Sequence, residues 1–234
     1  MIIKAGSSSI TATYLTKMFH EVQFDGVSCL TRTKVNAFIK AEEVSNMDNK
    51  EERMFFSSMC KAIIGEDREL RKLFANNDPL YAQQHNGICC LYETTMVYLV
   101  FKQLMKDSFP YTVSWEHPYP NNNSLKADMG ILNADNSVNS LVEFKIWFSE
   151  KGDEVRADVE KYNQCNFTGD KYLCIIEYGG PDMNDNCKFL MDSNPELVFI
   201  SMKAFNTYFF DSWKTRQRIY NPVNMYFFKI KNSF

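Results

Sequence analysis

The chain has 234 residues, a length that suits one domain with an appendage or two small domains. Hydrophobic residues make up 45% and charged residues 24% of the chain, a composition that favours a folded protein over a disordered one. Its formal net charge of −3 argues against a protein that coats nucleic acid by bulk electrostatics. The seven cysteines lack paired C-x-x-C spacing and are expected to be free thiols. No leader and no membrane-spanning stretch is predicted, so we expect a cytoplasmic protein without membrane association.

Charge is distributed unevenly along the chain. From residue 201 onward six lysines and arginines stand against one aspartate, so this tail carries +5 and the first 200 residues carry −8. The tail therefore offers a local basic surface to an anionic partner. A solvated face with ordinary lysines is the alternative interpretation.

The first part of the chain, residues 1–80, is predicted to be a mainly helical N-terminal region. Residues 49–74 place apolar side chains at helical spacing, and Gly65 is expected to break that helix. A turn signal that ends in Pro79 marks the preferred boundary. The second domain is accordingly predicted to span residues 81–234.

The second domain alternates helical and extended patterns. An apolar run predicts a buried helix, three strands separated by turn signals follow, and a polar helix precedes a fourth strand. The predicted ranges are 88–105 for the first helix, 111–117, 125–132 and 140–148 for the strands, 153–165 for the second helix, and 171–178 for the fourth strand. Beyond these, strands are predicted at 196–201 and 225–230, with a helix at 205–218. The order predicts an α/β (α+β) fold with a central mixed β-sheet flanked by helices.

Three charged residues interrupt the apolar strands of one predicted hairpin. Strand alternation places Asp128 on the face opposite Ala127 and Met129, and it places Glu143 and Lys145 together on one face of the next strand. Charged groups in the middle of apolar strands are costly unless they have a partner or a metal ion. A hard cation such as Mg²⁺ prefers a few carboxylates together with waters and phosphate oxygens. A structural ion pair of Lys145 with one of the carboxylates is the alternative.

This pattern resembles the signature of the PD-(D/E)xK nuclease superfamily, in which an acid on one strand is followed on the next strand by acid-x-lysine. The matching residues are Ala127-Asp128 and Glu143-Phe144-Lys145, with alanine at the place of the name-giving proline. The predicted order of helix, three strands, helix and strand is also that of the family core. The resemblance implies a restriction-endonuclease-like core in which Asp128 and Glu143 bind Mg²⁺ or Mn²⁺ and Lys145 positions or helps to deprotonate the attacking water.

Further site residues are implied by the same resemblance. Glu93 stands on the first core helix, where family members often carry a glutamate, and the resemblance implies that it is a further metal ligand, directly or through water. Its spacing with Val97 and Val100 directs it inward. A glutamate satisfied by a nearby tyrosine or lysine is the alternative. Lys161 and Gln164 stand where such nucleases often place a residue near the scissile phosphate, and a solvated helix face is the alternative for both.

The functional hypothesis from the sequence is a metal-dependent endonuclease whose partner is nucleic acid. The resemblance implies DNA more often than RNA, a restriction, defence or mobile-element context, and a possible homodimer. Two alternatives stay open: a catalytically inactive binding module built on the nuclease fold, and an RNA-cleaving relative.

Overall fold

The computed structural model describes residues 50–75, 87–120, 122–148, 152–165, 167–179, 182–210 and 218–231. They belong to one compact unit, Asn46–Phe234. These segments contain one mixed six-stranded sheet with the strand order β1-β2-β3-β4-β6-β5. The strands are β1 (Thr112–Tyr119), β2 (Asn122–Leu132), β3 (Val138–Trp147), β4 (Asp170–Tyr178), β5 (Leu197–Phe210) and β6 (Arg218–Ile230).

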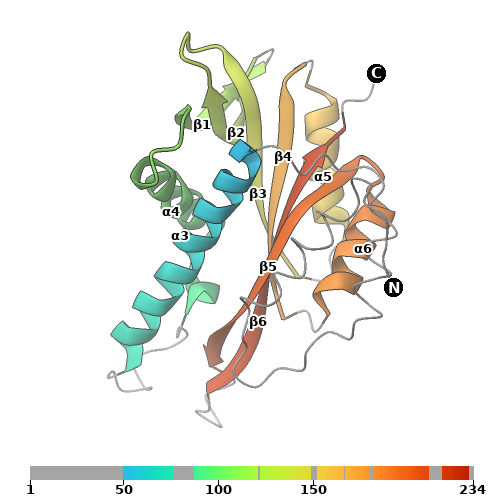
Figure 1. The fold of residues 1–234 in the computed structure, drawn as a ribbon. Coiled ribbons are helices and arrows are strands. Elements are labelled where there is room, and N and C mark those ends of the chain that lie inside the picture. Colours follow the sequence, from blue (N-terminus) through green and yellow to red (C-terminus); the bar gives the residue numbers. More distant parts are fainter. Residues whose placement is uncertain are drawn as a thin grey trace, which may run out of the picture. The chain divides into compact units, whose positions relative to one another are not determined.

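Helices cover both sides of this sheet. Helices α3 (Lys50–Ala75) and α4 (Glu93–Lys106) lie on one side, and α5 (Gly152–Asn163) and α6 (Met183–Ser193) lie on the other (Figure 1). The predicted α+β class, a mixed sheet flanked by helices, is therefore confirmed for the described residues.

The strand connections position the candidate site. Strands β1, β2 and β3 form an antiparallel meander, whereas β3 and β4 are parallel and are connected through α5. Strand β6 is antiparallel to β4, and β5 is antiparallel to β6 at the far edge. The chain thus passes from β3 to β4 over one face of the sheet, which brings the side chains of α5 above β3.

Helix α3 does not stop at Gly65, so the predicted break is wrong. A Cβ atom at this position would meet no atom within 4 Å, because Gly65 faces open space. One glycine inside a helix costs only about 1 kcal/mol, and the buried side chains Phe55, Met59 and Ile63 hold the helix in the core. The same apolar cluster contains residues of the sheet, so α3 packs as part of the sheet's own core. The predicted boundary at residue 80 lies outside the described residues.

The predicted helix at 88–105 is divided in two. A 3₁₀ turn, η1 (Ile88–Cys90), is followed by the extended residues Leu91 and Tyr92, after which α4 begins at Glu93. Helix α4 ends at Lys106, one residue beyond the predicted range. The division places Glu93 in the first turn of α4, where the helix dipole favours a carboxylate.

The C-terminal part differs most from the prediction. The predicted helix at 205–218 is wrong, because residues up to Phe210 continue β5 and Arg218 begins β6, and the two strands pair from Leu197↔Ile230 to Phe210↔Arg218. Helix α6 was not predicted. Its signal is the N-cap Asp182, whose side chain accepts from the backbone N–H groups of the second and third following residues.

The described cysteines, which do not include Cys29, are all free thiols, as predicted. Within the described residues no helix has both the length and the apolar character needed to cross a bilayer.

Candidate active site

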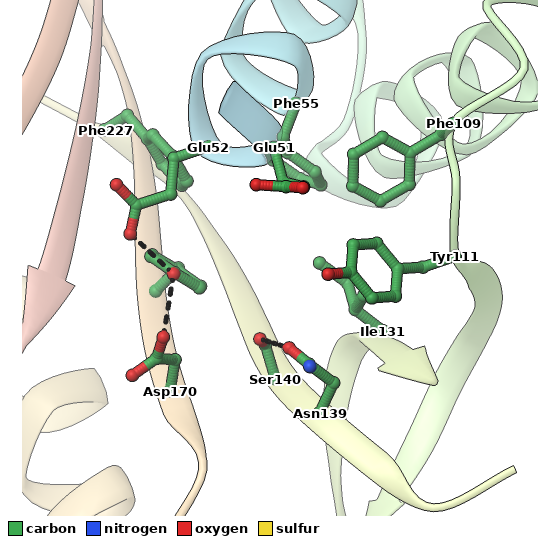
Figure 2. A pocket seen from close by; sticks show the side chains of 11 residues that line it. Glu51, Glu52, Phe55, Phe109, Tyr111, Ile131, Asn139, Ser140, Asp170 and Phe227 are labelled. Atoms are coloured by element: carbon green, nitrogen blue, oxygen red, sulfur yellow. Dashed lines mark hydrogen bonds between the residues drawn. The ribbon is translucent and has the colours of Figure 1, made fainter. Parts of the chain in front are cut away.

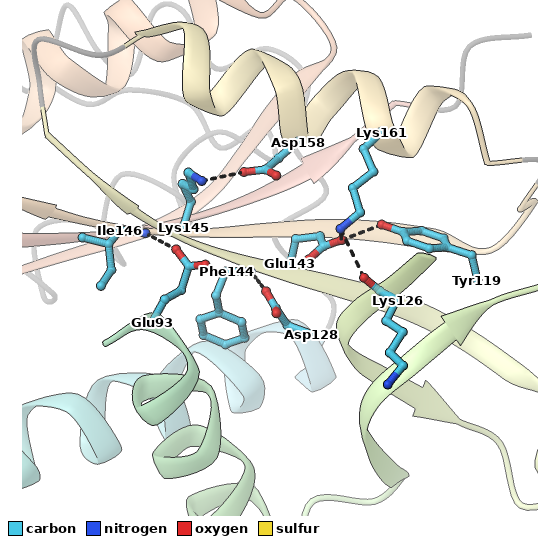
Figure 3. A network of polar contacts seen from close by, with 10 residues as sticks. All are labelled: Glu93, Tyr119, Lys126, Asp128, Glu143, Phe144, Lys145, Ile146, Asp158 and Lys161. Atoms are coloured by element: carbon cyan, nitrogen blue, oxygen red, sulfur yellow. Dashed lines mark hydrogen bonds and ion pairs between the residues drawn. The ribbon is translucent and has the colours of Figure 1, made fainter. Parts of the chain in front are cut away.

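The candidate site lies at the point where β2 stops pairing with β3. The pairing between these strands runs from Leu132↔Val138 to Met129↔Val142, and residues of β2 before Met129 pair with β1 alone. At this point the backbone N–H of Phe144 donates to Asp128 Oδ2 at 2.7 Å instead of to a strand. Two residues further along, the N–H of Ile146 donates to Glu93 Oε2, also at 2.7 Å (Figure 3). Two carboxylates thus replace the missing strand beside β3.

Asp128 lies close to Glu143, as the alternation of the hairpin predicts. Burial, together with the negative charge of Glu143, raises the pKa of Asp128 to about 8, although the hydrogen bond from the Phe144 N–H opposes this shift. The charge of Glu93 adds a smaller contribution in the same direction. Without a cation, the Asp128 carboxyl group is therefore protonated at neutral pH.

Glu143 is buried, with 4% of its surface exposed, and its carboxylate is held by residues from two other elements. Its Oε1 accepts a hydrogen bond of 2.5 Å from the hydroxyl of Tyr119, at the end of β1. The ammonium of Lys161, from the last turn of α5, forms a very short ion pair with the same oxygen. The structure therefore brings the Lys161 ammonium to Glu143, whereas the alternative was a solvated helix face.

Lys145 projects toward α5, with its Nζ 3.6 Å from Asp158 Oδ2 (Figure 3). This distance is too long for a hydrogen bond, and Asp158 Oδ2 is buried without a hydrogen-bond partner among the described residues. Burial raises the pKa of Asp158, while Lys145 lowers it. The two ion pairs of the site are thus Lys145 with Asp158 and Lys161 with Glu143, and neither is the pair of Lys145 with Asp128 or Glu143 that the sequence left open.

Two residues of this site were not predicted, and one predicted residue lies outside it. Tyr119 lies two residues beyond the predicted end of β1, and Asp158 stands three positions before Lys161 on α5. The three-residue spacing places Asp158 and Lys161 on the same face of α5, so the side of the helix that carries Lys161 is the signal for Asp158. Gln164 is exposed one residue beyond α5, and no described contact joins its side chain to the site.

The acidic residues of the site outnumber the basic ones. The site holds four carboxylates and two ammonium groups, from Glu93, Asp128, Glu143, Asp158, Lys145 and Lys161 (Figure 3). With every group ionised, one divalent cation would neutralise the excess charge. Within the described part of the chain no three His, Cys, Asp or Glu side chains converge closely enough to hold a metal by themselves. The pair Asp128 and Glu143 still fits Mg²⁺, which is often bound by one or two carboxylates and completes its coordination with water and substrate phosphate.

A separate pocket of about 150 Å³ lies between the start of α3 and the sheet, and no predicted site residue lines it (Figure 2). Its carboxylates are already engaged. The hydroxyl of Tyr172 donates to Glu52 Oε1 at 2.7 Å and lies 3.2 Å from Asp170 Oδ2, and Lys229 Nζ lies 2.8 Å from the same oxygen of Asp170. These contacts join α3 to β4 and β6, which is a structural role.

The sequence matches no family model and no curated protein, and the structure matches no solved structure. The geometry of the site is therefore the basis on which a function can be proposed.

Proposed function

We propose that this chain is a metal-dependent hydrolase of phosphodiester bonds with its centre at Asp128, Glu143 and Lys145. More particularly, we propose a DNA endonuclease of the PD-(D/E)xK type with a restriction-endonuclease-like core, acting in restriction, defence or a mobile element. The observation that carries the proposal is the convergence of two carboxylates, one with its pKa raised to about 8 by burial and by the other, beside a lysine on the same strand. Perturbed carboxylates of this kind are typical of functional sites.

The roles of the residues follow from their contacts. Asp128 and Glu143 would hold the cation. One oxygen of each carboxylate accepts a hydrogen bond, from Phe144 N–H and from Tyr119 OH respectively, so the other oxygen of each would be the ligand atom. A bound Mg²⁺ or Mn²⁺ lowers the pKa of a coordinated water and neutralises charge on the phosphate. Lys145, on the same face of β3 as Glu143, would orient the attacking water and stabilise the charge that develops on the phosphate. Glu93 would support the site by fixing the backbone of β3.

One observation favours a second candidate function. Lys161 already supplies a cation to Glu143, so the site could be a self-neutralised remnant in a catalytically inactive binding module. An RNA-cleaving enzyme would use the same residues and differs only in substrate.

The proposed function is tested by incubating the purified full chain with plasmid DNA, single-stranded DNA and RNA in Mg²⁺ or Mn²⁺. We expect cleavage of DNA that excess EDTA abolishes, because the two carboxylates cannot neutralise the substrate phosphate without a cation. Asp128→Asn, which preserves the shape of the side chain, serves as the inactive control. Undiminished cleavage in excess chelator would contradict the metal mechanism, and a protein that neither binds Mn²⁺ nor cleaves any of the substrates would favour the inactive module.

Glu93→Gln is expected to weaken cleavage less than Asp128→Asn does. A glutamine oxygen can still accept from the Ile146 N–H, so the variant loses only the charge of a supporting residue, about a tenfold effect. Asp128 is the proposed direct ligand, and the loss of its charge should cost at least tenfold more. Single-turnover rates of the two variants at saturating Mn²⁺ provide the comparison. An equal loss in two folded variants would place Glu93 among the direct ligands.

A further inference from the structure

We propose that Lys161 is a tethered counter-ion, which occupies Glu143 in the metal-free protein and is displaced from it when a divalent cation binds. The inference rests on the proposed function, and it adds that α5 sets the cation concentration at which the site is loaded.

The surroundings of the Lys161 ammonium resemble those of a bound cation. Its Nζ contacts the Glu143 carboxylate and the backbone carbonyl oxygen of Lys126, the latter at 3.1 Å. It also lies 5.4 Å from the centre of the Tyr119 ring, within the range of a cation–π interaction. Strands β1, β2 and β3 each supply one of these partners. Anionic oxygen, carbonyl oxygen and an aromatic face are all groups that stabilise positive charge.

Burial of Glu143 makes an exchange of cations more favourable than simple loss of Lys161. A carboxylate with 4% exposure needs a counter-charge. The Lys161 side chain is long and 29% exposed, so its ammonium can move toward solvent while the backbone of α5 stays in place. Tyr119 would continue to hold Glu143 Oε1 after the ammonium leaves.

The two cations cannot occupy Glu143 together without repulsion. Mg²⁺ binds carboxylate oxygens at about 2.1 Å, so a metal on Glu143 would lie only a few ångströms from an ammonium on the same carboxylate. Two positive charges at that separation repel strongly in a partly buried site. Lys161 and the metal are therefore expected to compete, although both interact favourably with the same acidic centre.

The competition is tested by titrating the full-length wild-type chain and Lys161→Met with Mn²⁺ in an isothermal calorimeter. The expected result is that Lys161→Met binds Mn²⁺ about tenfold more tightly, since the competing charge is gone. Lys126→Met is the matched control. It removes the same charge from the adjacent part of β2, but the Lys126 side chain is 54% exposed and pairs with Glu116 at 2.9 Å, away from Glu143. Its Mn²⁺ affinity should stay within about twofold of wild type.

The outcomes separate the inference from the proposed function. If Lys161→Met binds Mn²⁺ no more tightly than Lys126→Met while Asp128→Asn abolishes binding, the metal site stands and the competition is refuted. If neither the wild type nor Lys161→Met binds Mn²⁺, both ideas are overturned. Should Lys161→Met fail to fold, Lys161→Arg decides, because it keeps the charge and must not bind Mn²⁺ more tightly than wild type. Tighter binding by the arginine variant would contradict the inference.

Discussion

Replacing Lys145 with alanine is expected to lower the single-turnover rate of DNA cleavage by about 10²- to 10³-fold and to leave Mn²⁺ affinity nearly unchanged. In the proposed mechanism the Lys145 ammonium is needed as charge develops in the transition state, whereas the ground-state complex depends on the carboxylates. The ion pair of Lys145 with Asp158 is long, at 3.6 Å, so its loss should cost little stability. Single-turnover kinetics, a Mn²⁺ titration and the melting temperature of this one variant provide the test.

Lys61 on α3 provides a matched variant. It lies outside the site, and its Nζ is 3.1 Å from Asp107 Oδ2. Lys61→Ala also removes a lysine from an aspartate, and it should leave cleavage unchanged. If Lys145 were only a structural partner of Asp158, Lys145→Ala would lose melting temperature in proportion to any activity lost. A folded Lys145→Ala protein that cuts DNA at the wild-type rate would refute the catalytic role.

The second large effect concerns stability without metal. We expect Asp128→Asn to melt at a higher temperature than wild type in EDTA at pH 8, by several degrees. In the folded protein the pKa of Asp128 is raised to about 8, mainly by burial and by Glu143. In the unfolded chain an aspartate ionises near pH 4. The folded state therefore binds an extra proton between these values, so wild-type stability falls as pH rises from about 4 to about 8.

Asparagine does not titrate, so the advantage of Asp128→Asn should grow through that pH window and vanish below it. Asp135, in the turn between β2 and β3, is the control with the opposite sign. Hydrogen bonds from Ser137 lower its pKa, so it stabilises the fold above its ordinary pKa, and Asp135→Asn should melt lower at neutral pH. Added Mn²⁺ should raise the melting temperature of the wild type and leave that of Asp128→Asn unchanged. An Asp128→Asn curve that follows wild type at every pH would contradict the assigned pKa shift.

The sequence predicts the strands of this site well because their pattern is local. Alternation along β2 and β3 places Asp128 near Glu143, and the turn residues between them define the hairpin. The predicted mixed sheet follows from the order of elements. What alternation cannot predict is where β2 stops pairing with β3, since that depends on packing from other elements.

Long-range partners explain the remaining differences. Tyr119 and Lys161 meet at Glu143 from positions 24 residues before it and 18 residues after it, so no local pattern joins them. The helix predicted at 205–218 failed for a related reason, because pairing with β6 outweighs the local propensity of residues after Phe205. Helix α3 also continues through Gly65, because tertiary packing outweighs the low helix propensity of a single residue.

The carboxylates that replace β2 beside β3 have a consequence for self-association. A strand edge with unsatisfied N–H groups is a template for pairing with another chain. Asp128 and Glu93 accept the N–H groups of Phe144 and Ile146, so they close this short stretch of edge within one molecule. The acidic groups proposed for catalysis therefore also protect solubility. A variant that lacked the proposed cleavage would still need a hydrogen-bond acceptor at both positions, which asparagine or glutamine can provide and alanine cannot.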